Sequence, residues 1–144
     1  MHRRYDMHTH SLRSDGTLSP TELITRARAN GVDVLALTDH DVTDGIVEAQ
    51  VAAEKVGLTL IAGVEISVTW EGQTLHIVGL NIDVSDASLQ QGLSGLREFR
   101  QWRAQEIGRR LHKKRIEGAF EGAMRYVHGT IEIPADKFMN WAGG

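Results

Sequence analysis

The stretch that decides the fold reads Val32-Asp33-Val34-Leu35-Ala36-Leu37-Thr38-Asp39-His40-Asp41. It begins as a short, mainly apolar run, which is typical of a buried β-strand. Three ionisable side chains follow directly, namely Asp39, His40 and Asp41. We therefore predict a buried strand over residues 32–37 that presents polar groups at its carboxyl end.

The segment before this strand predicts a helix. Ser19 is suited to the N-cap and Pro20 to the first helical position, and Glu22 completes a capping box with Ser19. Gly31 supplies the left-handed residue that commonly ends a helix. We therefore expect a helix between these two signals, immediately before the strand.

The same pattern repeats after the strand. Asp44 or Thr43 is suited to cap a second helix that ends at Gly57. Residues 58–62 form a further apolar run, and we expect Gly63 to end that strand. Strands that alternate with helices at this spacing are typical of right-handed βαβ units and a parallel sheet. The sequence therefore predicts an α/β fold.

The chain begins with another candidate strand, Tyr5-Asp6-Met7-His8-Thr9-His10. Because side chains alternate along a strand, Asp6, His8 and His10 point to one face. The two imidazoles are then placed to bind one divalent ion, and Asp6 is placed to accept the ring N–H of a ligating histidine. The alternative is that these are simply polar residues leaving a strand.

A β-hairpin is predicted next. Residues 66–70 and 74–80 are strand-like and flank Glu71-Gly72-Gln73, which reads as the turn. Glu65 emerges directly before the hairpin, and His76 falls inside its second strand. Taken alone, a histidine in a strand is more often a core or edge residue than a metal ligand.

The pattern becomes helical from residue 86 to about residue 116, with a short helix over 117–127 and a weaker helical signal over 134–141. One face of the long helix is rich in arginine. These arginines either form a solvated face, or some of them reach over the candidate site and bind a substrate phosphate through the guanidinium fork. The candidates for the phosphate role are Arg100 and Arg103.

Composition limits the classes of protein to consider. A chain of 144 residues with 41% hydrophobic and 24% charged residues has the size and balance of one globular domain. A net charge of −3 gives no general basic field, so we expect no DNA-binding patch and no attraction to a membrane surface. Without an apolar run long enough to span a bilayer or a signal peptide, we expect a cytoplasmic protein.

The absence of cysteine leaves histidine and carboxylates as the strong metal ligands. In a parallel sheet the candidate residues gather at the carboxyl ends of the strands. Such a set can start two or three metal sites, with Glu65 bridging two ions. It suits Mn, Fe, Zn or Mg, and paired metals favour hydrolysis of a phosphate ester. The candidate ligands are His8, His10, Asp15, His40, Glu65 and His76.

These motifs resemble the polymerase and histidinol phosphatase (PHP) family. The matching residues are Asp6-x-His8-x-His10-Ser, Ser14-Asp15-Gly16, Thr38-Asp39-His40-Asp41, Gly63-x-Glu65 and His76. The branch that they resemble dephosphorylates nucleoside 3′,5′-bisphosphates or AMP and trims RNA from its 5′ end. The resemblance implies a distorted (β/α)7 barrel with up to three divalent ions, often manganese.

The resemblance also implies a role for each residue. His8 and His10 would bind the first ion, Asp15 and His40 the second, and His76 the third. Glu65 would bridge the first and third ions. Asp41 would not bind an ion itself but would help to position a residue that does.

The family pattern is incomplete in this chain, because a later histidine and a late Asp-x-His pair have no counterpart. We therefore expect one incomplete PHP domain over residues 1–144, with the motifs in 1–82 and a helical segment in 86–141. Half a barrel leaves an open sheet edge, which self-association could cover. The alternative to a phosphoesterase is a truncated metal-binding or structural relic with weak catalysis.

Overall fold

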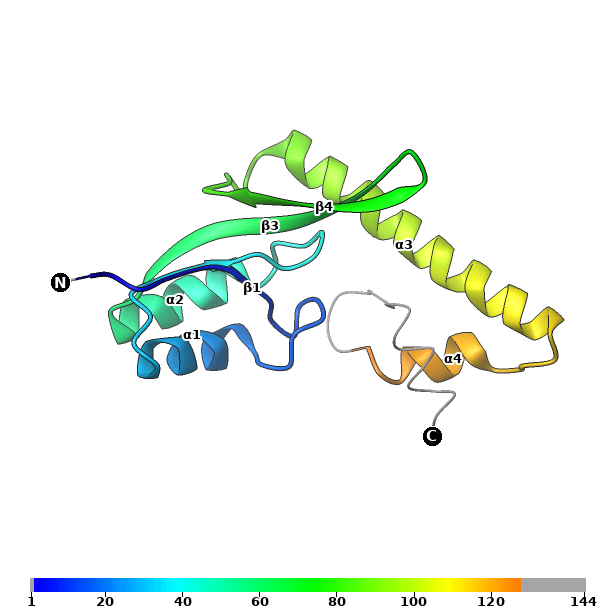
Figure 1. Cartoon of the computed structure of the whole chain (residues 1–144), viewed down its shortest axis with the longest axis horizontal. Helices are drawn as coiled ribbons and strands as arrows, with labels where there is room; N and C mark the ends of the chain where they lie inside the picture. Colours follow the sequence, from blue (N-terminus) through cyan, green and yellow to red (C-terminus); the bar gives the residue numbers. More distant parts are fainter. Residues whose placement is uncertain (1, 128–144) are drawn as a thin grey trace.

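The computed structural model describes residues 2–127, which form one four-stranded sheet with helices. The strand order is β1-β2-β3-β4, in which β1, β2 and β3 are parallel and β4 runs antiparallel to β3 (Figure 1). The elements are β1 (Tyr5–Thr9), α1 (Pro20–Ala29), β2 (Val34–Leu37), α2 (Ile46–Val56), β3 (Thr59–Trp70), β4 (Gln73–Leu80), α3 (Ala87–Lys113) and α4 (Ala119–Met124). The predicted α/β half-barrel is confirmed. The helical signal over 134–141 lies outside the described residues.

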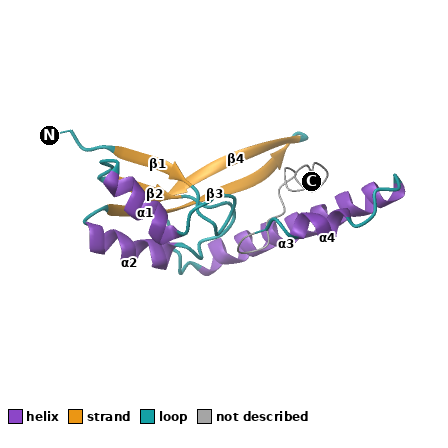
Figure 2. Cartoon of the chain, turned by 90° about the horizontal axis from the view of Figure 1, so that it is seen from below, coloured by secondary structure: helices purple, strands orange, loops and turns teal. Residues whose placement is uncertain are grey.

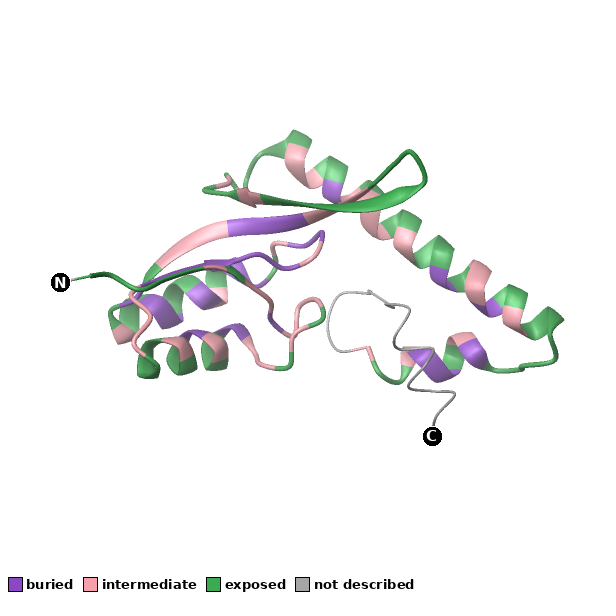
Figure 3. Cartoon of the chain, in the orientation of Figure 1, coloured by how far each residue is buried: buried purple, intermediate pink, exposed green. Residues whose placement is uncertain are grey.

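The main core lies between the parallel strands and the two helices α1 and α2 (Figures 1 and 2). Leu35 and Leu37 of β2 are fully buried, as are Ile24 of α1 and Ala49 of α2. In Figure 3, stretches of α1, α2, β2 and β3 in this layer are coloured as buried, as are parts of α3 and α4. Burying these apolar side chains contributes on the order of 1.5 to 3 kcal/mol for each large one. This layer gives the strand ends a rigid base.

The helix starts differ in how well they were predicted. Helix α1 has the expected capping box, because Ser19 and Glu22 each accept a hydrogen bond from the other's backbone N–H. The predicted cap of α2 is wrong, since its N-cap is Gly45, with no side-chain cap. A Cβ at position 45 would lie only 3.0 Å from Pro20. Close packing of α2 on the start of α1 therefore decides this position.

The prediction that Gly63 ends a strand is also wrong. Strand β3 is continuous over 12 residues; its first part pairs with β2 and its second part pairs with β4. At Gly63 the neighbouring backbone comes so close that a Cβ would lie 2.9 Å from the carbonyl oxygen of Gly79. Glycine is used there for close approach and not as a terminator. Glu65 consequently lies in the middle of a strand, where its backbone is fixed on both sides.

Helix α3 leaves the sheet and pairs with α4 (Figure 1). Their contact is tight, because Gly108 of α3 lies against Phe120 of α4. In the described part of the chain, no helix combines the length and apolarity that a membrane crossing requires. Large apolar side chains remain exposed on the hairpin and on α3, namely Trp70, Leu75, Ile77, Val78, Leu80, Phe99 and Trp102.

Candidate metal centre

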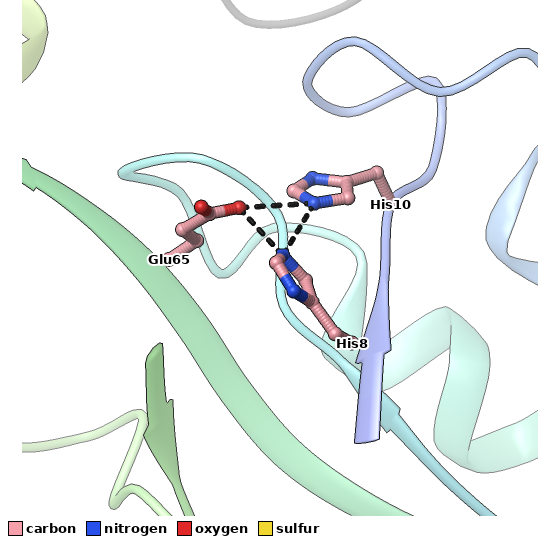
Figure 4. A group of neighbouring side chains, drawn as sticks. All are labelled: His8, His10 and Glu65. Atoms are coloured by element: carbon pink, nitrogen blue, oxygen red, sulfur yellow. Dashed lines mark hydrogen bonds and ion pairs between the residues drawn. The ribbon is translucent and has the colours of Figure 1, made fainter. Parts of the chain in front are cut away.

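His8 and His10 meet Glu65 at the carboxyl end of the parallel strands. His8 lies within β1, and His10 is the first residue after that strand. Because side chains alternate along a strand, both rings lie on one face, as predicted. The Nε2 atoms of the two rings are 3.0 Å apart, and Glu65 Oε2 lies 2.8 Å from that of His8 and 3.0 Å from that of His10. Figure 4 shows this triangle of donor atoms.

Glu65 is the hub of the whole cluster. While Oε2 faces the two N-terminal histidines, it also lies 3.5 Å from Nε2 of His40. The other oxygen, Oε1, lies 3.0 Å from Nδ1 of His76 on β4. Burial by itself would raise the pKa of Glu65, but the hydrogen bond from His8 and the charges of the surrounding imidazoles outweigh it and lower that pKa. Glu65 is therefore a carboxylate at neutral pH, with its two oxygens turned toward different histidines.

Asp15 closes the cluster on its exposed side. Its Oδ1 lies 3.3 Å from His10 Nδ1, and its Oδ2 lies 3.6 Å from His40 Nε2. All six residues predicted as ligands are thus brought together. They form three groups, and within each group the donor atoms lie within 4.8 Å of one another. The groups are His8–His10–Glu65, His10–Asp15–His40 and His40–Glu65–His76.

The donor atoms of this cluster fit a cation. Three ligand atoms that each lie about 2.0 to 2.2 Å from one ion stand roughly 3 to 3.5 Å apart. The edges of the triangle drawn in Figure 4, at 2.8, 3.0 and 3.0 Å, are close to the lower end of that range. The buried Nδ1 atom of His10 has no hydrogen-bond partner among the described residues, since Asp15 Oδ1 is near it but poorly aligned. A polar atom buried in this way needs a partner, and a cation would supply one.

His40 is the most enclosed histidine of the cluster, with a side chain only 12% exposed. Burial lowers its pKa, because a charged imidazolium is costly to desolvate, although Asp15 and Glu65 act in the opposite direction. The neutral imidazole that results at neutral pH is the form that binds metals.

The loop that carries Asp15 is held by Asp39, a residue to which the sequence analysis gave no role of its own. Asp39 is buried, and its carboxylate accepts hydrogen bonds from the backbone N–H and the hydroxyl of Ser11 at 2.6 and 2.7 Å. The hydroxyl of Ser14 donates a third at 2.7 Å. The signal was the pair of serines beside the first motif, which gives a buried aspartate its donors. Asp39 therefore fixes the loop on which Asp15 stands.

The two residues predicted to support ligands lie in different surroundings. Asp6 is exposed, and within residues 2–127 no hydrogen bond joins it to a histidine. Asp41 is fully buried, and its carboxylate contacts Ser67 and Arg100 instead of a ligand directly. The structure thus brings Asp41 to the cluster through other side chains and leaves Asp6 at the surface.

A pocket of about 250 Å³ opens beside the cluster. Asp15, His40 and His76 line it on one side, and Arg100 and Arg103 of α3 line it on another. Both predicted arginines therefore border the same space as half of the candidate ligands. A negatively charged group in this pocket would meet guanidinium groups and the metal-binding cluster together.

Comparison with known proteins identifies the family of this chain. The sequence model of the PHP domain matches residues 6–131. A 5′-3′ exoribonuclease of Haemophilus influenzae is 50% identical over 131 residues, covering 91% of this chain and 48% of the relative. A 3′,5′-nucleoside bisphosphate phosphatase of Chromobacterium violaceum is 50% identical over 133 residues, covering 92% and 47%. The chain thus spans about half the length of these relatives.

Solved structures show the same fold. An amidohydrolase from Chromobacterium violaceum with bound sulfate superposes with a TM-score of 0.87 at 45% identity, over 96% of this chain and 49% of the other. A protein from Bifidobacterium adolescentis assigned as a metal-dependent phosphoesterase gives a TM-score of 0.83 at 29% identity, over 99% and 51%. With the family pattern matched over most of its length, this chain belongs to the PHP domain family.

Proposed function

We propose that this chain carries the metal-binding half of a phosphoesterase that hydrolyses phosphate esters of nucleotides. The observation that carries the proposal is a cluster of six candidate metal-ligand side chains, with Glu65 at its centre, beside a pocket bordered by two arginines. Binding sites for a metal and for a phosphate in one pocket are what hydrolysis of a phosphate ester requires.

Each of the three groups would hold one divalent ion. His8, His10 and Glu65 form the first, Asp15 and His40 with His10 the second, and His76 with Glu65 and His40 the third. When bound, such ions activate water and stabilise the charge that develops on a transferring phosphoryl group. Manganese is our first choice, and the mixed imidazole and carboxylate donors also suit Fe, Zn or Mg.

The arginines of α3 would bind the phosphate. Arg103 is exposed and borders the pocket, and its side chain has no ion pair or hydrogen bond with another described residue. We assign it the direct contact with a substrate phosphate, since a guanidinium forks onto two oxygens. Arg100 is held at the pocket wall by Asp41, and we propose that its positive charge assists there.

The substrate would be a nucleoside 3′,5′-bisphosphate, AMP or the 5′ end of a short RNA. This proposal is supported by the names of two relatives that are 50% identical to the chain, an exoribonuclease and a bisphosphate phosphatase. We propose that the reaction takes place in the cytoplasm, where such nucleotides occur.

A second candidate is a truncated metal-binding or structural relic with weak catalysis. It is favoured by the apolar side chains that β4 leaves exposed, because such a surface is typical of a face that packs against another segment. We propose that the 144 residues act as one incomplete domain whose open edge strand is covered by a second copy.

The test is phosphate release from a nucleoside 3′,5′-bisphosphate by the purified chain, with saturating manganese and over a range of protein concentrations. A phosphoesterase releases phosphate, and the rate per chain rises with concentration if two copies complete each other. A chelator should abolish the reaction. Metal binding without any release of phosphate at high protein concentration would favour the relic and contradict the proposed enzyme.

A further inference from the structure

A second polar cluster lies behind the candidate metal centre and centres on Asp41. This residue is fully buried and has a left-handed backbone with φ of 53°, which is uncommon outside glycine. Its Oδ1 accepts the backbone N–H of Ser67 at 3.0 Å, and its Oδ2 accepts Nε–H of Arg100 at 2.6 Å. A side-chain N–H of Arg97 donates to its carbonyl oxygen at 2.8 Å. Asp41 thus ties the loop after β2 to both β3 and α3.

These contacts hold the hydroxyl of Ser67 in one place. The backbone of Ser67 is anchored by Asp41, and a terminal N–H of Arg100 donates to Ser67 Oγ. The same Oγ lies 3.4 Å from Nδ1 of His40. A serine oxygen can accept two hydrogen bonds, so it can accept one from Arg100 and one from the imidazole ring.

The position of the ring proton on His40 decides whether the residue can bind a metal. Nε2 is the nitrogen of His40 that faces Asp15 and Glu65, at 3.6 and 3.5 Å. A neutral imidazole can offer the Nε2 lone pair to a cation only when its proton is on Nδ1. The two carboxylates attract the proton to Nε2, which is the wrong tautomer for binding. An acceptor beside Nδ1 opposes that preference.

We propose that Ser67 is a positioning residue that accepts the Nδ1–H of His40 and so keeps its Nε2 lone pair available to the metal. Asp41 and Arg100 hold the serine for this role. The inference rests on the proposed function, because it assumes that His40 binds a metal. It assigns to the Asp41–Arg100 pair a task apart from binding substrate.

The test uses zinc, which is diamagnetic and suits this ligand set. In the zinc-loaded chain, ¹⁵N NMR of the His40 ring should report a proton on Nδ1. Ser67→Ala should weaken the zinc site that includes His40 by about 10- to 100-fold in a competition titration, as loss of a partner behind a ligand typically does. The His40 ring should then give a mixture of tautomers.

Two further variants separate this role from a general structural one. Ser67→Thr keeps the hydroxyl and should restore zinc affinity and the Nδ1–H tautomer. Ser85→Ala removes a hydroxyl that bonds to Asp83 in a surface turn, and it should leave zinc binding unchanged. Unchanged zinc affinity and tautomer in Ser67→Ala would overturn the inference while leaving the proposed function standing. If the unaltered chain bound no zinc or manganese, the proposed function would fail and this inference with it.

Discussion

Replacing Gly63 by alanine tests whether the close approach of neighbouring segments to β3 at this residue positions Glu65. The added Cβ would lie 2.8 Å from the methyl group of Thr38, 2.9 Å from the carbonyl oxygen of Gly79 and 3.1 Å from that of Leu37, all closer than the 3.4 Å of ordinary contact. Two of these atoms belong to backbone in the sheet. Thr38 is fully buried and also fixed, because its hydroxyl bonds to the backbone of Thr9. The neighbouring atoms therefore cannot move away from the added Cβ without a substantial cost in free energy.

The expected cost follows from this geometry. Overpacking of a well-packed site costs about 1 to 3 kcal/mol, and clashes with backbone place Gly63→Ala near the upper end. For a chain of this size that corresponds to a fall in Tm of roughly 6 to 10 °C. Because Glu65 lies two residues further along the same strand, its carboxylate would shift, and metal affinity should fall by about tenfold or more.

The assay is thermal and urea unfolding of the metal-free chain, followed by a metal titration of the folded variant. Gly92→Ala is the matched control, because it lies within α3 and no heavy atom would come within 4 Å of the new Cβ. That control should stabilise the chain by up to about 1 kcal/mol, since alanine favours a helix. A Gly63→Ala variant within about 0.5 kcal/mol of the original chain would refute the reasoning.

Three further predictions follow from the site. His10→Ala should remove at least one equivalent of bound metal, whereas His112→Ala on α3 should remove none; equal metal content in both would contradict the ligand assignment. Arg103→Ala should raise KM for a phosphorylated nucleotide several-fold without changing metal content, and Arg109→Ala should change neither. Because burial lowers the pKa of His40 below its ordinary 6.5, the metal-free chain should lose stability as pH falls below about 6.5, where the unfolded chain takes up the proton first. Urea unfolding across this pH range should show a smaller loss of unfolding free energy in His40→Gln than in the original chain. If the free energy of unfolding depended on pH equally in both proteins, His40 would not have this role.

Local signals in the sequence predicted the elements that depend on neighbours along the chain. The capping box of Ser19 and Glu22 is present, and the turn around Gly72 connects β3 to β4. The roles of Gly45 and Gly63 were not predictable in the same way. Both are set by close approach of segments that are distant in the sequence. Spacing alone carries no information on such contacts.

His76 and Ser67 illustrate the same limit within the site. A histidine in a strand says little by itself, but the pairing of β3 with β4 sets Ser67 opposite His76 and brings the His76 ring to Glu65. The contact of Ser67 with His40 depends instead on the loop after β2, where Asp41 binds the backbone of Ser67, and on Arg100 of α3. The set of motifs taken together was more informative than any single residue, because it predicted the six candidate ligands that the structure brings together.

The arginines of α3 have divided roles that helical spacing did not separate. Arg109 and Arg110 pair with Glu106 and, as two hydrogen-bond donors, lower the pKa of that carboxyl to about 2, so they form the solvated face. Arg100 joins Asp41, whereas Arg103 borders the pocket. The solvated-face interpretation therefore fits Arg109 and Arg110, whereas phosphate binding by Arg103 stays a prediction.

The most direct test of the metal centre is a count of metal equivalents in the chain and in Glu65→Gln. After removal of metal with a chelator, both proteins are saturated with manganese, freed of excess ion and analysed for bound metal. Glu65 contributes to two of the three groups, and an amide has one oxygen ligand and no charge. We predict more than one equivalent in the original chain and at least one fewer in Glu65→Gln. Equal metal content in the two proteins would contradict a centre built around Glu65.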